Sequence, residues 1–168
     1  MYKKILVVGP SGSGKSTLSR ELRDILHLPL YHLDNYFWTK DKKEVPLFDF
    51  YQKLLAILAE KQWIIDGDYS RSYELRIKQA DTVIFLDYPL EVCLEGVRSR
   101  IGKKRDDIPW VEESFDPEFE QFIISSSKTR KEELLRLLDK YQDQLEIIIL
   151  NNREEAQKFL KKLREKEK

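Results

Sequence analysis

Residues 3–17 have the sequence KKILVVGPSGSGKST, and this stretch decides the fold. It begins with an apolar run typical of a buried strand, continues through a glycine-rich turn and ends where a helical pattern starts. The turn matches the phosphate-binding pattern G-x-x-x-x-G-K-[ST] in the strand-to-helix context that the pattern requires. We therefore predict a nucleotide-binding loop made of Gly9, Pro10, Ser11, Gly12, Ser13, Gly14, Lys15, Ser16 and Thr17.

The residue types in this loop suit the phosphates of a nucleotide. Glycines permit backbone torsions that let successive N–H groups converge on phosphate oxygens, at a helix N-terminus whose dipole favours anions. Lys15 supplies a positive charge for the β- and γ-phosphates, and the Ser16 hydroxyl is placed to ligate Mg²⁺. The expected cofactors are therefore ATP and Mg²⁺. The alternative is a glycine-rich turn that binds no ligand.

The length and charge of the chain limit what else it does. Its 168 residues suit one domain covering residues 1–168, in the form of a monomer or a homodimer. Thirty basic residues balance thirty acidic ones, so we expect no direct binding to nucleic acid and none to an anionic membrane. The chain runs directly into its first strand, and no apolar run approaches about 18 residues. These features predict a cytoplasmic protein.

Apolar strand patterns alternate with helical patterns along the chain. Such alternation predicts a three-layer α/β fold, a parallel sheet with helices on both faces. After the first strand, the further strands are expected at residues 30–33, 63–66, 82–87 and 146–150. A long helical region follows residue 117, and the three serines at 125–127 are expected to break or bend it. Asn151 or Asn152 is expected to cap the last helix.

Three residues of chemically versatile types are expected to be structural. Cys93 is the only cysteine and lies in an apolar helical stretch, which favours the core. His27 and His32 have no partner motif in the sequence, so we expect neither to be catalytic.

A second group of candidate residues, with the sequence DNYFW, begins at Asp34 directly after the second strand. Because the carboxyl ends of parallel strands meet in one crevice, Asp34 is expected to face the phosphate loop. Its carboxylate can accept a proton from a hydroxyl or hold a water bound to Mg²⁺, and Tyr36 and Trp38 can stack on a planar acceptor. We predict a catalytic and substrate-binding Asp34, with Tyr36 and Trp38 in the acceptor site. The alternative is an aspartate that caps the next turn.

A third group of candidates, with the sequence DGDYSR, ends the third strand. Asp66 is a candidate for the carboxylate that holds the Mg²⁺ shell through water, although Asp87 after the fourth strand is an alternative. Arg71 can grip a phosphate or carboxylate of the substrate, and Asp68 lies between the two. A simple Asp-Gly turn explains Asp66 but does not predict the arginine.

Basic residues gather near the end of the helix that follows the fourth strand. Five of them fall within residues 98–105, more than helix capping requires. Phosphoryl transfer spreads negative charge over the transferred group, and cations on a mobile segment can stabilise it. We therefore expect a lid segment at about residues 101–115.

Four stretches together resemble a known family over nearly the whole chain: GPSGSGKST, YHLDNYFW, WIIDGDYSRS-ELR and ADTVIFLDYPLEVCL. They are similar to bacterial DNA topology-modulation proteins, relatives of adenylate kinase. The resemblance implies a five-stranded parallel sheet of order 2-3-1-4-5, Mg²⁺-ATP and a closing lid. It also implies that Lys15 contacts the transferred phosphate, Arg71 binds the acceptor, and Arg100 and Arg105 are catalytic arginines of the lid.

The chain departs from the family pattern at several positions. Leu90 and Gly96 stand where many relatives have arginine. No arginine lies between Asp34 and Trp63, where nucleoside monophosphate kinases have one for the acceptor phosphate. Asp34 and its aromatic neighbours also resemble a stretch of uridine-kinase-like enzymes, in which the carboxylate receives the proton of the acceptor hydroxyl. An unphosphorylated nucleoside or another small alcohol is therefore an alternative acceptor.

The sequence thus predicts an ATP-dependent kinase that phosphorylates a small acceptor, a nucleoside monophosphate or a nucleoside. Two other functions stay open. One is a nucleotide-binding regulatory protein that acts on DNA topology indirectly. The other is a nucleoside triphosphatase, which shares the phosphate loop but needs no acceptor pocket.

Overall fold

The computed structural model describes residues 2–167, which build a five-stranded parallel sheet. The strands are β1 (Lys4–Val8), β2 (Leu30–His32), β3 (Trp63–Asp66), β4 (Thr82–Leu86) and β5 (Glu146–Leu150). Their order across the sheet is β2-β3-β1-β4-β5, which confirms the predicted fold class and strand order. Because β1 lies in the centre, the phosphate loop at its carboxyl end lies between the ends of β3 and β4.

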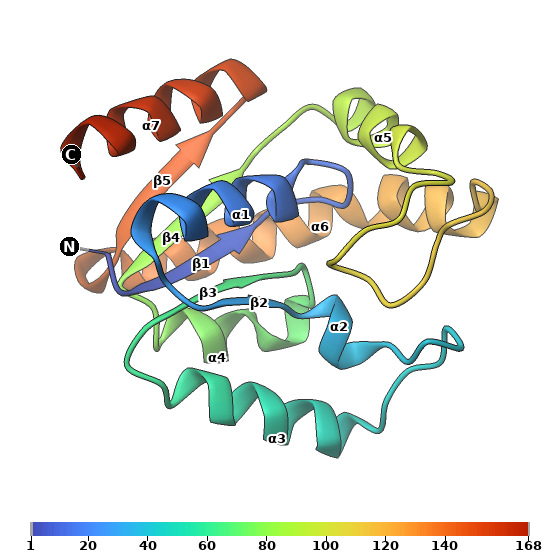
Figure 1. The fold of residues 1–168 in the computed structure, drawn as a ribbon, viewed down its shortest axis with the longest axis horizontal. Helices are drawn as coiled ribbons and strands as arrows, with labels where there is room; N and C mark the ends of the chain where they lie inside the picture. The colour runs from blue at the N-terminus through green and yellow to red at the C-terminus, as the bar shows by residue number, and fades with distance from the viewer. Residues whose placement is uncertain (1, 168) are drawn as a thin grey trace.

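Helices cover both faces of the sheet (Figure 1). α1 and α7 lie on one face, with α5 beyond them near the carboxyl ends of the strands, and α3, α4 and α6 lie on the other. The bounds are α1 (Lys15–Leu26), α2 (Asp34–Phe37), α3 (Leu47–Leu58), α4 (Tyr73–Ile77), α5 (Leu90–Ser99), α6 (Pro117–Tyr141) and α7 (Arg153–Lys166), with short 3-10 turns η1 (Ser70–Ser72) and η2 (Gln142–Gln144). None of the helices in this part of the chain is both long and apolar enough to cross a membrane.

The apolar side chains of β1 alternate between two cores. Ile5 and Val7 pack with α1 and α7, whereas Leu6 and Val8 pack with α3, α4 and α6. All four are buried because both faces of a central parallel strand are covered, which explains the continuous apolar run in the sequence. Cys93 is also fully buried, as expected.

The serines at residues 125–127 do not interrupt α6, so the predicted break is wrong. Their hydroxyls donate to carbonyls of the preceding turn, Ser126 Oγ to Phe122 O at 2.5 Å and Ser127 Oγ to Ile124 O at 3.0 Å. A serine that bonds back in this way satisfies its hydroxyl without ending the helix. At the start of α7, Asn152 is the capping residue, because its Oδ1 accepts from Glu155 N at 2.8 Å.

The lid segment, residues 101–115, connects α5 to α6 without forming a helix. It lies beyond the carboxyl ends of the strands, near the start of α1 and near α2 (Figure 1). The chain thus brings three kinds of segment to one end of the sheet: the phosphate loop, the turns after β2 and β3, and the lid segment.

Candidate active site

The phosphate loop folds around the carbonyl of Pro10. This oxygen accepts hydrogen bonds from Ser13 N at 3.2 Å, Ser13 Oγ at 2.7 Å and Lys15 Nζ at 2.9 Å. Gly14 precedes α1 with a φ of 91°, in the left-handed region that favours glycine. The start of α1 therefore faces the inside of the loop, the arrangement that binds phosphate in nucleotide-binding proteins.

Helix α5 packs directly against the loop through two glycines. A Cβ at Gly12 would lie 1.9 Å from Cys93 O, and a Cβ at Gly96 would lie 2.1 Å from Gly12 O. Both distances are too short for any side chain. The close approach requires glycine at both positions, and it places α5 directly behind the phosphate loop.

Lys15 lies among three carboxylates that come from two strand ends. Burial lowers the pKa of Lys15, while the charges of Asp68, Asp34 and Asp66 raise it again. Three of the predicted site residues, Asp34, Asp66 and Asp68, thus act electrostatically on the lysine of the phosphate loop.

Asp34 begins α2 and is held by one hydrogen bond, from the hydroxyl of Tyr69 to its Oδ1. Burial raises the pKa of Asp34, and the Tyr69 hydrogen bond and the charge of Lys15 counteract this rise. A carboxylate with a raised pKa is a better proton acceptor, so the position suits a general base.

The two predicted aromatic residues of the acceptor site have protein partners. Tyr36 lies 6.3 Å from Tyr31 between ring centroids. Trp38 lies edge-on to Trp110 of the lid segment at 5.8 Å. Trp38 therefore connects the turn after β2 with the lid segment, whereas Tyr36 packs near Tyr31 of β2.

Asp66 is buried at the end of β3, with His32 beside it. The register of the parallel pair aligns His32 with Asp66, and His32 Nδ1 lies 2.8 Å from Asp66 Oδ2. Burial alone would lower the pKa of His32, but the hydrogen bond and charge of Asp66 outweigh this and raise it. The alternative metal residue, Asp87, forms an ion pair with Lys131 at 2.9 Å. Both candidates for the carboxylate near the metal therefore have a partner within the protein.

Asp68 receives hydrogen bonds from two side chains. The Tyr73 hydroxyl donates to its Oδ1, and Arg130 of α6 donates to its Oδ2 at 2.6 Å. The predicted substrate residue Asp68 therefore lies where α6 meets the turn after β3, and Arg130 enters the site from a helix far along the chain.

The arginine that holds the turn after β3 is Arg76, while the predicted Arg71 is exposed to solvent. Arg76 is fully buried and donates to the carbonyls of Gly67, Asp68 and Tyr69 at 2.9 to 3.2 Å. Arg76 thus fixes the backbone that carries Asp68, and Arg71 can reach a substrate only from the rim.

The two predicted catalytic arginines of the lid are paired with acids of the lid segment. Arg100 Nε lies 3.0 Å from Glu112 Oε2, and Arg105 NH1 donates to the same oxygen at 2.9 Å. Arg105 also forms a two-pronged pair with Asp107, at 2.9 Å and 2.5 Å. Both guanidinium groups thus have carboxylate partners within the lid segment.

The lid segment is fixed to the site through Asp106 and Asp107. The Ser16 hydroxyl donates to Asp107 Oδ2 at 2.6 Å. Next to this contact, Arg20 binds the Asp106 carboxylate at 2.6 Å, and Asn35 Nδ2 donates to the Asp106 carbonyl at 2.7 Å. Burial would raise the pKa of Asp107, but its bonds with Arg105 and Ser16 hold that pKa well below the usual range.

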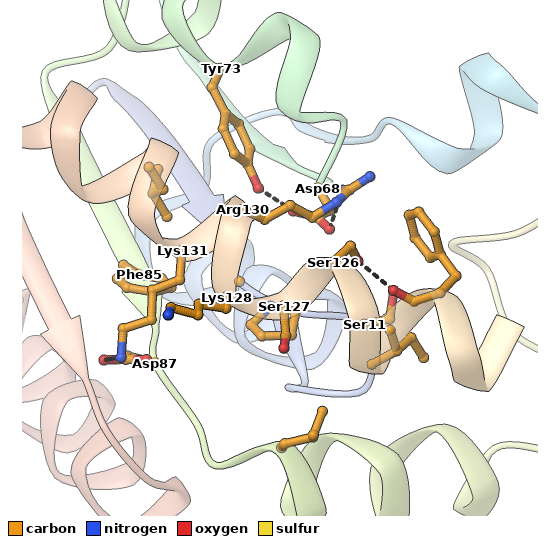
Figure 2. Close-up of a pocket in the computed structure, with 16 residues that line it drawn as sticks. Ser11, Asp68, Tyr73, Phe85, Asp87, Ser126, Ser127, Lys128, Arg130 and Lys131 are labelled. Atoms are coloured by element: carbon orange, nitrogen blue, oxygen red, sulfur yellow. Dashed lines mark hydrogen bonds and ion pairs between the residues drawn. The ribbon is translucent and has the colours of Figure 1, made fainter.

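A cavity of about 260 Å³ adjoins the phosphate loop on the side of α6 (Figure 2). Apolar side chains such as Phe85, Leu90 and Leu134 line it, together with the loop residues from Gly9 to Ser11. Figure 2 shows the side chains of α6 directed across it, with Arg130 toward Asp68 and Lys131 toward Asp87. Two ion pairs therefore border a mostly apolar hollow beside the phosphate loop.

The candidate metal residues fit an ion that arrives with a nucleotide. Within residues 2–167, no three His, Cys, Asp or Glu side chains converge closely enough to hold a metal by themselves. Magnesium at a phosphate loop takes only one or two protein oxygens and fills its shell with phosphate and water. Ser16 and Asp66 provide this kind of sparse oxygen set.

The structure thus adds four residues that sequence reasoning missed: His32, Arg76, Asp107 and Arg130. The sequence did contain a signal for His32. The strand order implied by the family resemblance places β2 beside β3, so the ends of these two strands, which carry His32 and Asp66, lie together. Arg76 was within a quoted motif but had no assigned role. Asp107 and Arg130 lie in segments that were predicted, the lid segment and the long helix, but no local pattern marks these two residues, so only the folded chain brings them to the site.

Comparison with known proteins places the chain among kinases. No protein-family model matches it. An uncharacterized protein of Bacillus subtilis, YqaC, is 37% identical over 114 residues, which are 60% of this chain and 57% of that protein. The chain therefore spans little more than half the length of YqaC. Shikimate kinase 1 of Enterobacter sp. (strain 638) is 30% identical over 118 residues, which are 61% of this chain and 67% of that enzyme.

Solved structures show the same fold over nearly the full chain. Shikimate kinase from Bacteroides thetaiotaomicron has a TM-score of 0.62 at 19% identity and covers 98% of both chains. A gluconokinase from Sinorhizobium meliloti has a TM-score of 0.54 at 19% identity, over 98% of this chain and 94% of the other. The names of these proteins do not bear out the topology-modulation label, which stays a prediction. With 30% identity across two thirds of shikimate kinase 1, the chain belongs to the family of P-loop kinases that includes this enzyme.

Proposed function

We propose that the protein transfers the γ-phosphate of Mg²⁺-ATP to a hydroxyl of a small acceptor molecule. The observation that carries this proposal is the position of Asp34 at the start of α2, directly after β2. Its half-buried carboxylate accepts from the Tyr69 hydroxyl, and the charges of Asp34 and Lys15 each shift the pKa of the other. A lysine for the transferred phosphate and a base for the attacking hydroxyl are the two groups that a kinase needs in one crevice.

The remaining residues have supporting roles in this proposal. The loop from Gly9 to Thr17 binds the phosphates, and Ser16 and Asp66 hold the Mg²⁺ shell. The bound metal neutralises charge that develops on the phosphates. Arg100 and Arg105 bind the transferred group once they have released Glu112 and Asp107.

The cavity beside the phosphate loop has room for part of a compact acceptor, and Asp68 lines it while Asp34 does not. Its volume of about 260 Å³ lies just below the range of about 300–1,000 Å³ that is usual for small-molecule sites. Asp68 and Arg130 offer an acceptor and a donor of hydrogen bonds at its border. The acceptor candidates are therefore nucleosides, nucleoside monophosphates and small hydroxylated compounds. Shikimate and gluconate belong to the last group, because a shikimate kinase and a gluconokinase share this fold.

Release of ADP from Mg²⁺-ATP tests the proposal against a panel of these compounds, with Lys15→Ala as the blank. We expect one acceptor class to raise turnover well above the rate without acceptor, and Lys15→Ala to abolish the gain. If no compound raises turnover while ATP is still slowly hydrolysed, the protein is a nucleoside triphosphatase. If ATP binds without turnover, it is a regulatory ligand.

A further inference from the structure

The lid segment reaches the phosphate loop through the contact between Asp107 and Ser16. The Ser16 hydroxyl is the expected metal ligand of the loop, and it donates to Asp107 Oδ2 at 2.6 Å. Asp107 is 3% exposed, although it belongs to a segment that is otherwise largely at the surface. A carboxylate of the lid segment is therefore buried at the position where the loop serine would meet a cation.

The spacing of the two oxygens matches the coordination shell of Mg²⁺. Magnesium takes octahedral oxygen ligands at about 2.0–2.1 Å, so neighbouring ligand oxygens lie about 2.9 Å apart. Ser16 Oγ and Asp107 Oδ2 are 2.6 Å apart, within a few tenths of an ångström of that separation. A hydroxyl and a carboxylate are both hard oxygen donors, so one cation can bind both with little movement of the lid segment.

The neighbours of Asp107 hold its carboxylate in this position. Arg105 binds both of its oxygens, and the adjacent Asp106 is fixed by Arg20 and Asn35. The carboxylate is thus oriented before any ligand binds, which lowers the entropic cost of ligation. When Arg105 moves to a phosphate, the negative charge of Asp107 loses its main partner, and a divalent cation can replace it.

We propose that Asp107 is a ligand of the Mg²⁺ that accompanies ATP, so that the lid segment closes on the metal as well as on the phosphates. This inference rests on the proposed function, because the metal arrives with the nucleotide. The same contact has an opposite explanation, in which Asp107 occupies the place of the cation and has to leave when Mg²⁺-ATP binds. The two explanations predict opposite effects of removing the carboxylate.

Calorimetric titration with ADP, in Mg²⁺ and in EDTA, separates the two explanations. The ratio of the two ADP affinities measures how strongly the metal and the nucleotide are coupled. Asp107→Asn keeps an oxygen for Ser16 but removes the charge, and Glu113→Gln, at an exposed position of the lid segment, is the matched control. We expect Asp107→Asn to reduce the ratio about tenfold or more and to change the affinity in EDTA little, while Glu113→Gln keeps the wild-type ratio.

A second readout uses the wild-type protein alone. Trp110 of the lid segment lies edge-on to Trp38 at 5.8 Å, so tryptophan fluorescence reports the position of the lid segment. Because Arg105 leaves Asp107 for the phosphates, the metal is what keeps the lid segment at Ser16, and the inference predicts different emission with ADP in Mg²⁺ and with ADP in EDTA. Emission that responds equally to ADP in both solutions contradicts the inference.

Three other results of the ADP titration can be told apart, and each rejects the inference for a different reason. If Asp107→Asn binds ADP more tightly in both solutions and its ratio stays at the wild-type value, Asp107 competes with the ligand and the inference is overturned. If the wild-type protein binds no ADP in either solution, the proposed function fails, and the inference fails with it. Wild-type coupling that Asp107→Asn leaves unchanged rejects the inference and leaves the proposed function intact.

Discussion

At the scale of single residues, Asp34 distinguishes a kinase from a hydrolase. Asp34→Asn keeps the oxygen that accepts from Tyr69 but cannot take up the proton of an acceptor hydroxyl. We expect acceptor-dependent turnover to fall about 10²-fold or more, with ATP binding within a few-fold of wild type. Steady-state ADP release and nucleotide titration measure the two effects, and Asp41→Asn, at an exposed loop position, is the control. Undiminished turnover in Asp34→Asn would show that Asp34 is not the base.

Arg76 is fully buried and Arg71 is exposed, although the two lie only five positions apart in the sequence. Arg76→Met leaves the carbonyls of Gly67, Asp68 and Tyr69 without their buried donor. Because Gly67 and Arg76 are buried and a buried carbonyl without a donor is costly, we expect a loss of about 3 kcal/mol or more in the free energy of unfolding. Urea denaturation measures it. Arg71→Met, at an exposed position, should stay within about 0.5 kcal/mol of wild type.

At the scale of elements, α5 sets the position of the phosphate loop. Gly96→Ala places a Cβ 2.1 Å from Gly12 O, so either the loop or the helix must move. Because small displacements of binding groups have large effects, we expect ATP affinity to fall about tenfold or more. Glu95→Ala, on an exposed position of the same helix, should bind ATP like the wild type. If Gly96→Ala only lowers stability and keeps ATP affinity, the helix moves alone and does not support the loop.

At the scale of the whole molecule, local patterns predicted the fold well. The phosphate loop is a contiguous motif between a strand and a helix, and the five strands are short apolar runs, so each could be recognised without its neighbours. The strand order came from the family resemblance, and the structure confirms it. Asp34 and Asp66 lie at strand ends, whose meeting point follows from the parallel order.

What the sequence did not predict depends on contacts between distant segments. Arg130 meets Asp68 across 62 positions, and Ser16 meets Asp107 across 91. Neither pair has a spacing rule, because helix packing and the path of the lid segment bring the partners together. The predicted break at residues 125–127 was wrong for a different reason: serine is a weak helix former, but in α6 its hydroxyls bond to the preceding turn.

The destination of the γ-phosphate tests the central claim most directly. Phosphorus NMR of Mg²⁺-ATP with the protein and the best acceptor of the panel separates a phosphoester product from inorganic phosphate. We predict that the γ-resonance of ATP is replaced by a phosphoester resonance, and that Lys15→Ala leaves ATP unchanged. Inorganic phosphate as the only product, at the same rate with and without acceptor, would contradict the assignment as a small-molecule kinase.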